Sequence, residues 1–113
     1  MKKRKGYIGV DFDGTLATYD KYEGPAIVGE PIQKMVDRVK RWLSNGKDVK
    51  IFTARVAPDH PLVEQVAAEN AIKEWCVKHI GVELDVTCIK YSNMYEFWDD
   101  KAVGVEKNTG ERK

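Results

Sequence analysis

The chain has 113 residues, of which 33% are charged and 42% hydrophobic. Its length fits one domain with one hydrophobic core, since domains usually have roughly 100–200 residues. The 19 basic and 18 acidic side chains leave a formal net charge of +1, which excludes the strong overall field that would favour nucleic acid or a membrane surface. We therefore expect a single globular domain over residues 1–113.

Residues 1–5 make a basic arm, and residues 107–113 make a polar tail. The basic side chains of the arm are Lys2, Lys3, Arg4 and Lys5. We interpret the arm as a solvated terminus, with contact to nucleic acid as the alternative.

The two cysteines, Cys76 and Cys88, lack C-x-x-C spacing and lie among apolar residues. This pattern favours free thiols over a disulfide or a zinc site. No apolar run approaches the ~20 residues of a membrane span, and the basic start is not followed by the apolar region of a signal peptide. We therefore expect a cytoplasmic setting without membrane contact.

The first half of the chain predicts a strand, a flap and a helix. Residues 7–10 are apolar and predict a short buried strand, and residues 17–30 are rich in Tyr, Gly, Pro and charge, as in a loop or flap. A helix is expected after Pro31, because apolar side chains recur there at helical spacing until Asn45 and Gly46 end it. The apolar positions are Ile32, Met35, Val36, Val39, Trp42 and Leu43.

The second half continues the alternation of strands and helices. In chain order we expect a strand at 48–53, a loop at 56–61, a helix at 61–79, and strands at 86–89, 96–98 and 102–105. Strand–helix–strand–helix–strand order predicts an α/β fold with a parallel sheet, right-handed crossovers and helices on both faces, as in three-layer Rossmann-like proteins. Ligands of such sheets bind beyond the carboxyl ends of the strands.

Polar side chains suited to chemistry follow four of the predicted strands. They are Asp11 and Asp13 after the first, Thr53 and Arg55 after the second, Lys90 after the third, and Asp99 and Asp100 after the fourth. Because the carboxyl ends of parallel strands meet at one edge of the sheet, we expect these side chains to converge there.

Asp11 and Asp13 carry the strongest signal. Side chains two apart on a strand point the same way, so both carboxylates can enter one small volume. Such a pair repels itself unless a cation compensates, and Mg²⁺ prefers oxygen ligands. The alternative is a solvated acidic turn, which the apolar neighbours Phe12 and Leu16 disfavour.

The segments DFDGT, IFTAR, a later Lys and the Asp-Asp pair together resemble the haloacid dehalogenase-like (HAD) superfamily of phosphotransferases. The resemblance covers residues 7–105, and FWDDKAVGVEKNTG is similar to small phage-type or bacterial members that have no cap domain. It implies a Mg²⁺-dependent phosphoric monoester hydrolase that acts through an aspartyl-phosphate. Residues 15–31 leave room only for a short flap, so a cap domain is absent from the expected fold.

The resemblance also implies roles for individual residues. Asp11 would be the nucleophile. Asp13 would be the general acid and base, with its main-chain carbonyl on the metal. Thr53 would donate its hydroxyl to a phosphoryl oxygen, and Lys90 would neutralise charge. Asp100 would bind the metal, with Asp99 behind it and orienting Lys90; the reverse order of the acidic pair stays open.

Backbone N–H groups near Phe12, Asp13 and Ala54 would hold the phosphate. Arg55 either grips an anionic group of the substrate or forms an ordinary surface ion pair.

Several neighbouring residues have plainer interpretations. Lys101 is the second choice for the cationic role, ahead of the mid-helix Lys73 and Lys78. We interpret His60 as a solvated loop residue. Tyr19 and Tyr22 cover apolar surface in the flap, with stacking on a nucleoside as the alternative.

The expected substrate is a small phosphorylated metabolite or nucleotide. A polynucleotide-end phosphatase is the alternative that an open site and a basic arm suggest. A partner copy that lids the site in a homo-oligomer would instead favour small substrates. A receiver-type phospho-acceptor domain and a metal-binding subunit without catalysis are the rivals from other classes.

Overall fold

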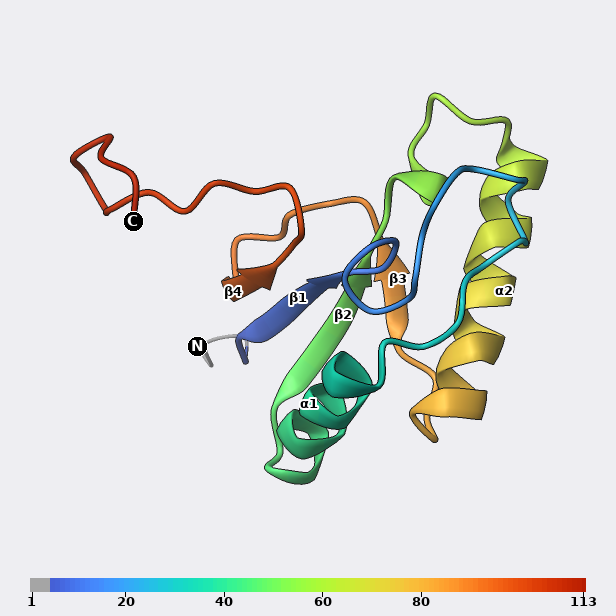
Figure 1. The fold of residues 1–113 in the computed structure, drawn as a ribbon, viewed down its shortest axis with the longest axis horizontal. Helices are drawn as coiled ribbons and strands as arrows, with labels where there is room; N and C mark the ends of the chain where they lie inside the picture. Colours follow the sequence, from blue (N-terminus) through green and yellow to red (C-terminus); the bar gives the residue numbers. More distant parts are fainter. Residues whose placement is uncertain (1–4) are drawn as a thin grey trace.

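The computed structural model describes residues 5–113, and within them four strands form one all-parallel sheet (Figure 1). The strands are β1 (Tyr7–Asp11), β2 (Asp48–Phe52), β3 (Asp85–Thr87) and β4 (Met94–Trp98), in the spatial order β3-β2-β1-β4. The helices are α1 (Gln33–Ser44) and α2 (Leu62–His79), with the one-turn 3₁₀ helix η1 (Ala54–Val56) after β2. The α/β class and the parallel sheet are confirmed.

A row of large apolar side chains crosses the whole sheet. Val86, Ile51, Val10 and Trp98 are in register on β3, β2, β1 and β4, so they project from the same face. The row is part of a hydrophobic core that also takes side chains from both helices. The helical members are Met35, Val36 and Val39 of α1 and Ile72, Trp75 and Cys76 of α2.

The expectation of helices on both faces is not met within residues 5–113, because both helices contribute to this one core. The steps from β1 to β2 and from β2 to β3 run in the same direction across the sheet. Right-handed crossovers then place both helices on one face. The return step to β4 runs through residues 88–93, which contain no helix.

Side chains of the strands themselves cover much of the opposite face. Gly9 has no side chain there, and a Cβ at this position would lie 2.6 Å from Met94 Sδ and 3.1 Å from the Phe97 ring. Phe97 in turn meets Phe52 edge to face, with 5.1 Å between ring centroids. The missing Cβ therefore lets two larger side chains close over β1.

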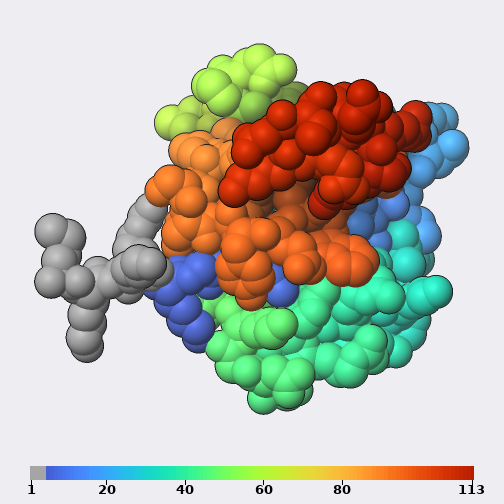
Figure 2. Space-filling view, turned by 90° about the vertical axis from the view of Figure 1, so that its left-hand side faces the viewer, coloured from blue at the N-terminus to red at the C-terminus, as the bar shows by residue number. Residues whose placement is uncertain are grey.

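The ends of the chain depart from the expected elements. The predicted strand at 102–105 is wrong: Val105 forms only an isolated antiparallel bridge with Arg112, and residues 101–113 are exposed throughout. Figure 1 shows this segment running away from the helices, and Figure 2 shows it above the residues of β4. The chain turns away from the sheet after β4, so this segment does not pair with the free edge of that strand.

Of the basic arm, Lys2, Lys3 and Arg4 lie outside the described residues. Lys5 is described, and its ammonium group lies 3.5 Å from the Asp48 carboxylate at the start of β2. Both side chains are exposed, so this pair contributes little to stability. None of the helices in residues 5–113 is long and apolar enough to cross a lipid bilayer.

Candidate metal and phosphate site

A cavity of about 330 Å³ lies at the carboxyl ends of the strands. Its walls come from the end of β1, the flap, the end of β2 with η1, and the segment after β4. The lining residues are Asp11, Asp13, Tyr19, Tyr22, Thr53, Ala54, Arg55, His60, Asp99, Asp100 and Lys101. The cavity lies beyond the ends of the paired strands β1 and β4. The chain places β2 and β3 on one side of β1 and β4 on the other, and ligands of open α/β sheets usually bind at such a switch point.

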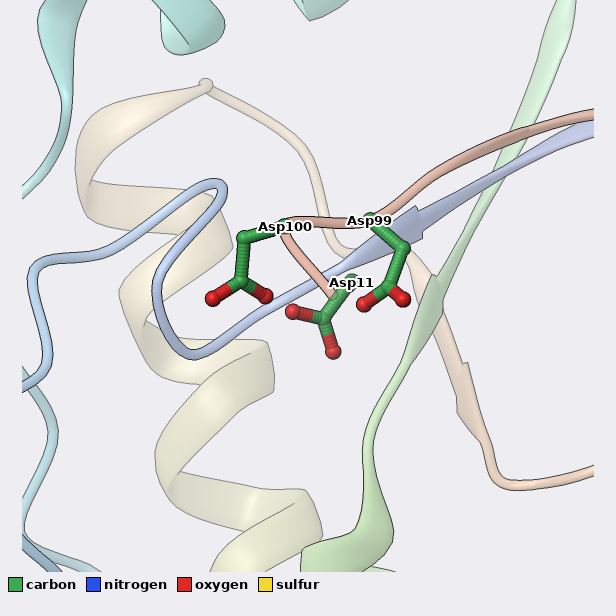
Figure 3. A group of neighbouring side chains, drawn as sticks. All are labelled: Asp11, Asp99 and Asp100. Carbon is green, nitrogen blue, oxygen red and sulfur yellow. The ribbon is translucent and has the colours of Figure 1, made fainter. Parts of the chain in front are cut away.

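Three carboxylates face one another in this cavity. Asp11, Asp99 and Asp100 each offer an oxygen, and these oxygens all lie within 4.8 Å of one another (Figure 3). Val10 is paired with Trp98 in the sheet, so the residues that follow each of them leave the sheet side by side. We call these three residues the acidic trio.

The acidic trio is electrostatically costly without a cation. The pKa of Asp11 rises from 3.8 to about 7, first because burial disfavours its charged form. A hydrogen bond with the Asp100 carboxyl group and the negative charges of Asp99 and Asp100 raise it further. The hydroxyl of Thr15 donates to Asp11 over 3.3 Å and partly opposes this rise. Oxygen ligands this close together suit a hard divalent cation such as Mg²⁺. The donor set therefore fits the cofactor that the sequence suggested.

Asp13 lines the same cavity but has a different partner. Its two carboxylate oxygens accept from Arg55 Nε over 2.8 Å and from Arg55 Nη2 over 3.1 Å. Arg55 is only 5% exposed. The ion pair that the sequence analysis considered as a surface contact is therefore a bidentate pair with a buried guanidinium. The expectation that the carboxylates of Asp11 and Asp13 enter one small volume is therefore not met. β1 ends at Asp11 and the chain turns, so the Asp13 carboxylate faces Arg55 instead of the acidic trio.

Thr53 is buried at the start of η1. Its hydroxyl oxygen accepts from the backbone N–H of Arg55 over 3.1 Å, which fixes the side chain at the wall of the cavity. Among the described residues, the proton of this hydroxyl has no acceptor. The Thr53 hydroxyl is therefore available to donate to a bound oxyanion.

The backbone N–H groups that we expected to hold a phosphate differ in whether they are free. The N–H of Phe12 donates to the carbonyl of Phe52 over 3.1 Å, and its ring packs on Trp75 in the core. The N–H of Asp13 makes no hydrogen bond within residues 5–113. Of the two, Asp13 is the one with a free donor, and Ala54 lines the cavity beside it.

The two lysines considered for the cationic role lie in different places. Lys90 is exposed in the connection between β3 and β4 and is not among the residues that line the cavity. Lys101 is also exposed but does line it, directly after the acidic pair. The structure brings Lys101 to the site and leaves Lys90 out of its wall.

Two further residues of the DFDGT segment matter in ways that the sequence reasoning missed. Thr15 reaches Asp11 with its hydroxyl. Gly14 has a φ of 88°, and a Cβ there would lie 2.7 Å from Asp100 Oδ2. Only their place directly after the two aspartates could have indicated a contact with the site.

Comparison of the chain with models of protein families, with curated proteins and with solved structures finds no match.

We predict that Gly14→Ala weakens Mg²⁺ binding and that Gly46→Ala does not. Both glycines have positive φ, 88° and 79°, so alanine costs each about 1–2 kcal/mol of folding free energy. Nothing lies within 4 Å of a Cβ at Gly46, whereas one at Gly14 would push Asp100 aside. Calorimetric Mg²⁺ titration beside urea unfolding checks this, and equal Mg²⁺ affinity in the two variants would contradict it.

In chelator, the free energy of unfolding should fall as pH rises from about 4 to about 7 through Asp11. In this window the folded protein keeps a proton on Asp11 that the unfolded chain has lost, so raising the pH favours unfolding. The measurement is urea unfolding at several pH values for the wild type and Asp11→Asn, which lacks this group. Identical pH slopes for the two proteins would rule the effect out.

Proposed function

We propose that this chain is a Mg²⁺-dependent phosphoric monoester hydrolase of the HAD-like type, without a cap domain. The observation that carries the proposal is the acidic trio, which meets Asp13 and Thr53 in one cavity at the carboxyl ends of β1, β2 and β4. These are the residues for which the sequence resemblance implied a metal, an acid and base, and a phosphate donor.

The strand order supports this proposal over a receiver-type domain. The order β3-β2-β1-β4 is the beginning of the doubly wound order 3-2-1-4-5-6, whereas flavodoxin-like sheets, including receivers, have the order 2-1-3-4-5. Turnover separates the two functions as well, because a receiver accepts phosphate once and a phosphatase releases it continuously.

In the proposed site Asp11, Asp100 and the main-chain carbonyl of Asp13 would hold Mg²⁺, and Asp99 would orient the groups around them. Since an oxygen of Asp99 lies within the same 4.8 Å limit of Asp11 as one of Asp100, the reverse order of the pair remains an alternative. Mg²⁺ bound there neutralises the carboxylates and the charge of a phosphate group. Without that neutralisation the trio would repel a dianionic substrate.

The reaction proceeds in two steps on the residues of the chain. An oxygen of Asp11 attacks phosphorus, the bond from phosphorus to the leaving oxygen breaks, and Asp13 gives that oxygen a proton. Asp13 then takes a proton from water, which attacks the phosphorus and releases Asp11 and phosphate. In both steps Thr53 donates its hydroxyl to a phosphoryl oxygen, where negative charge accumulates.

The first test is hydrolysis of p-nitrophenyl phosphate with Mg²⁺ and with excess chelator. We expect Mg²⁺-dependent turnover that Asp11→Asn abolishes, because the substitution removes the nucleophile and little volume. Asp59→Asn is the matched control, since Asp59 is an exposed carboxylate that does not line the cavity. Turnover that survives in chelator, or in Asp11→Asn, would refute the proposal.

A substrate screen extends this test. Phosphorylated metabolites and nucleotides are compared with a 3′-phosphorylated oligonucleotide. Within residues 5–113 the arginine and lysine side chains at the cavity are Arg55 and Lys101, and Arg55 is engaged with Asp13. We therefore expect the small substrates to be preferred.

Alanine at Lys101 should reduce kcat/KM more than alanine at Lys90. Removal of one charge-stabilising group typically costs roughly 10²-fold in rate, and Lys101 is the lysine at the cavity wall. Steady-state kinetics of both variants on one substrate measure the difference. A larger loss for Lys90→Ala would return the cationic role to Lys90, the residue that the sequence pattern favoured.

A further inference from the structure

Arg55 connects two parts of the cavity rim that are distant in sequence. Its Nε and Nη2 donate to the carboxylate of Asp13. Its Nη1 donates to the carbonyl of Gly24 over 2.8 Å and to that of Pro25 over 3.2 Å. The guanidinium carbon also lies 5.1 Å from the centre of the Tyr22 ring. All three nitrogens of the guanidinium are therefore already engaged, which argues against phosphate binding as its main task.

The flap that Arg55 contacts is closed at its base by other bonds. The N–H of Thr18 donates to the carbonyl of Glu30 over 2.8 Å, and the N–H of Glu30 donates to Thr18 Oγ1 over 3.1 Å. Beyond this base, the carbonyls of Gly24 and Pro25 near the tip are held by Arg55. Tyr22 and Tyr19, which line the cavity, belong to the same loop.

A two-pronged guanidinium does more to a carboxylate than balance its charge. It fixes the plane of the group and occupies one lone pair of each oxygen, so the direction in which each remaining lone pair points is fixed as well. For Asp13 that direction is set together with the position of the flap, because the same side chain holds both. A lysine would keep the charge and lose the geometry.

We propose that Arg55 is a positioning residue of the proposed phosphatase reaction, which acts by aiming the carboxyl group of Asp13 and by tying the flap tip to it. The inference rests on the proposed function, since Asp13 needs a leaving group to protonate. The same guanidinium that orients Asp13 thereby also holds the loop that carries Tyr19 and Tyr22 at the cavity wall.

The experiment compares Arg55→Lys, Asp13→Asn and the double variant on an aryl and an alkyl phosphate. Misplacement of the acid should cost Arg55→Lys ~10²-fold in kcat/KM on the alkyl phosphate, whose leaving group needs the proton, and about tenfold or less on the aryl one. We compare kcat/KM because it reports the steps up to departure of the leaving group, whereas the later attack of water is common to both substrates. In the Asp13→Asn background the lysine should have little further effect, because the two residues act as a unit. The matched control is Arg38→Lys, another arginine over an aromatic ring, 4.8 Å from the centre of Trp98 and outside the cavity wall.

Hydrogen exchange of backbone amides gives a readout that does not need turnover. We expect faster exchange in residues 19–27 of Arg55→Lys, with exchange in α1 unchanged. Asp13→Asn should change flap exchange in the same direction, because an amide leaves the guanidinium only one of its two acceptors on that side. If Arg55→Lys fails to fold, Asp13→Asn alone decides this part. Unchanged flap exchange would overturn the link between flap and acid.

The kinetic outcomes separate the two proposals. If the wild type hydrolyses no phosphate ester, the proposed function is refuted, and this inference is refuted with it. An active wild type whose lysine variant loses equally on both substrates, adds to Asp13→Asn and raises KM would overturn the positioning role alone. That pattern would identify Arg55 as a phosphate-binding residue instead.

Discussion

Parallel pairing between β1 and β4 joins the first strand of the chain to its last strand, and the position of the acidic trio depends on this pairing. Val10 and Trp98 are partners in this pairing, and the acidic trio follows directly. Burial raises the pKa of Asp11, and the neighbouring carboxyl groups of Asp100 and Asp99 raise it further. The force that holds them together is apolar: Trp98 packs into the core, with its ring 5.3 Å from that of Trp42 of α1. Hydrophobic burial on one face of the sheet thus offsets electrostatic repulsion at its edge.

The two aspartates of DFDGT show how a small change in backbone separates chemical roles. On a continuous strand both would point into the same space. Because β1 ends at Asp11, the next residues turn and Asp13 meets Arg55 instead of the trio. Asp11 stays with the acidic trio, where we propose the cation and the nucleophile, and Asp13 is fixed by a guanidinium. Both remain in the wall of one cavity.

Apolar patterning in the sequence was enough to predict the strands at 7–10 and 48–53, the first helix and the edge where the site lies. It was not enough for residues 102–105, because a strand must lie along a neighbour to form, and the path of the chain after β4 does not bring this segment to the free edge of β4. The number of layers failed for a related reason: it depends on residues 88–93, whose length and content decide whether a helix covers the second face.

The partners within the site were the least predictable from sequence. The trio could be inferred, because parallel strand ends converge whatever the side chains are. The contact between Arg55 and Asp13 could not, since a guanidinium near a strand end reaches a phosphate, a solvent ion or a carboxylate with equal ease. That choice depends on the path of the flap, where no periodic pattern constrains the backbone.

The chain order of the strands also has a consequence for folding. β1, β2 and β3 are joined by the two helices through mainly local crossovers, whereas the pairing of β4 with β1 has the largest sequence separation of the strand pairs and so the largest loop-closure entropy from the unfolded chain. A partly folded chain that lacks β4 carries Asp11 but neither Asp99 nor Asp100 beside it. The acidic trio therefore arises only with the last strand, so Mg²⁺, if it binds as we propose, would stabilise the completed sheet and not its precursors.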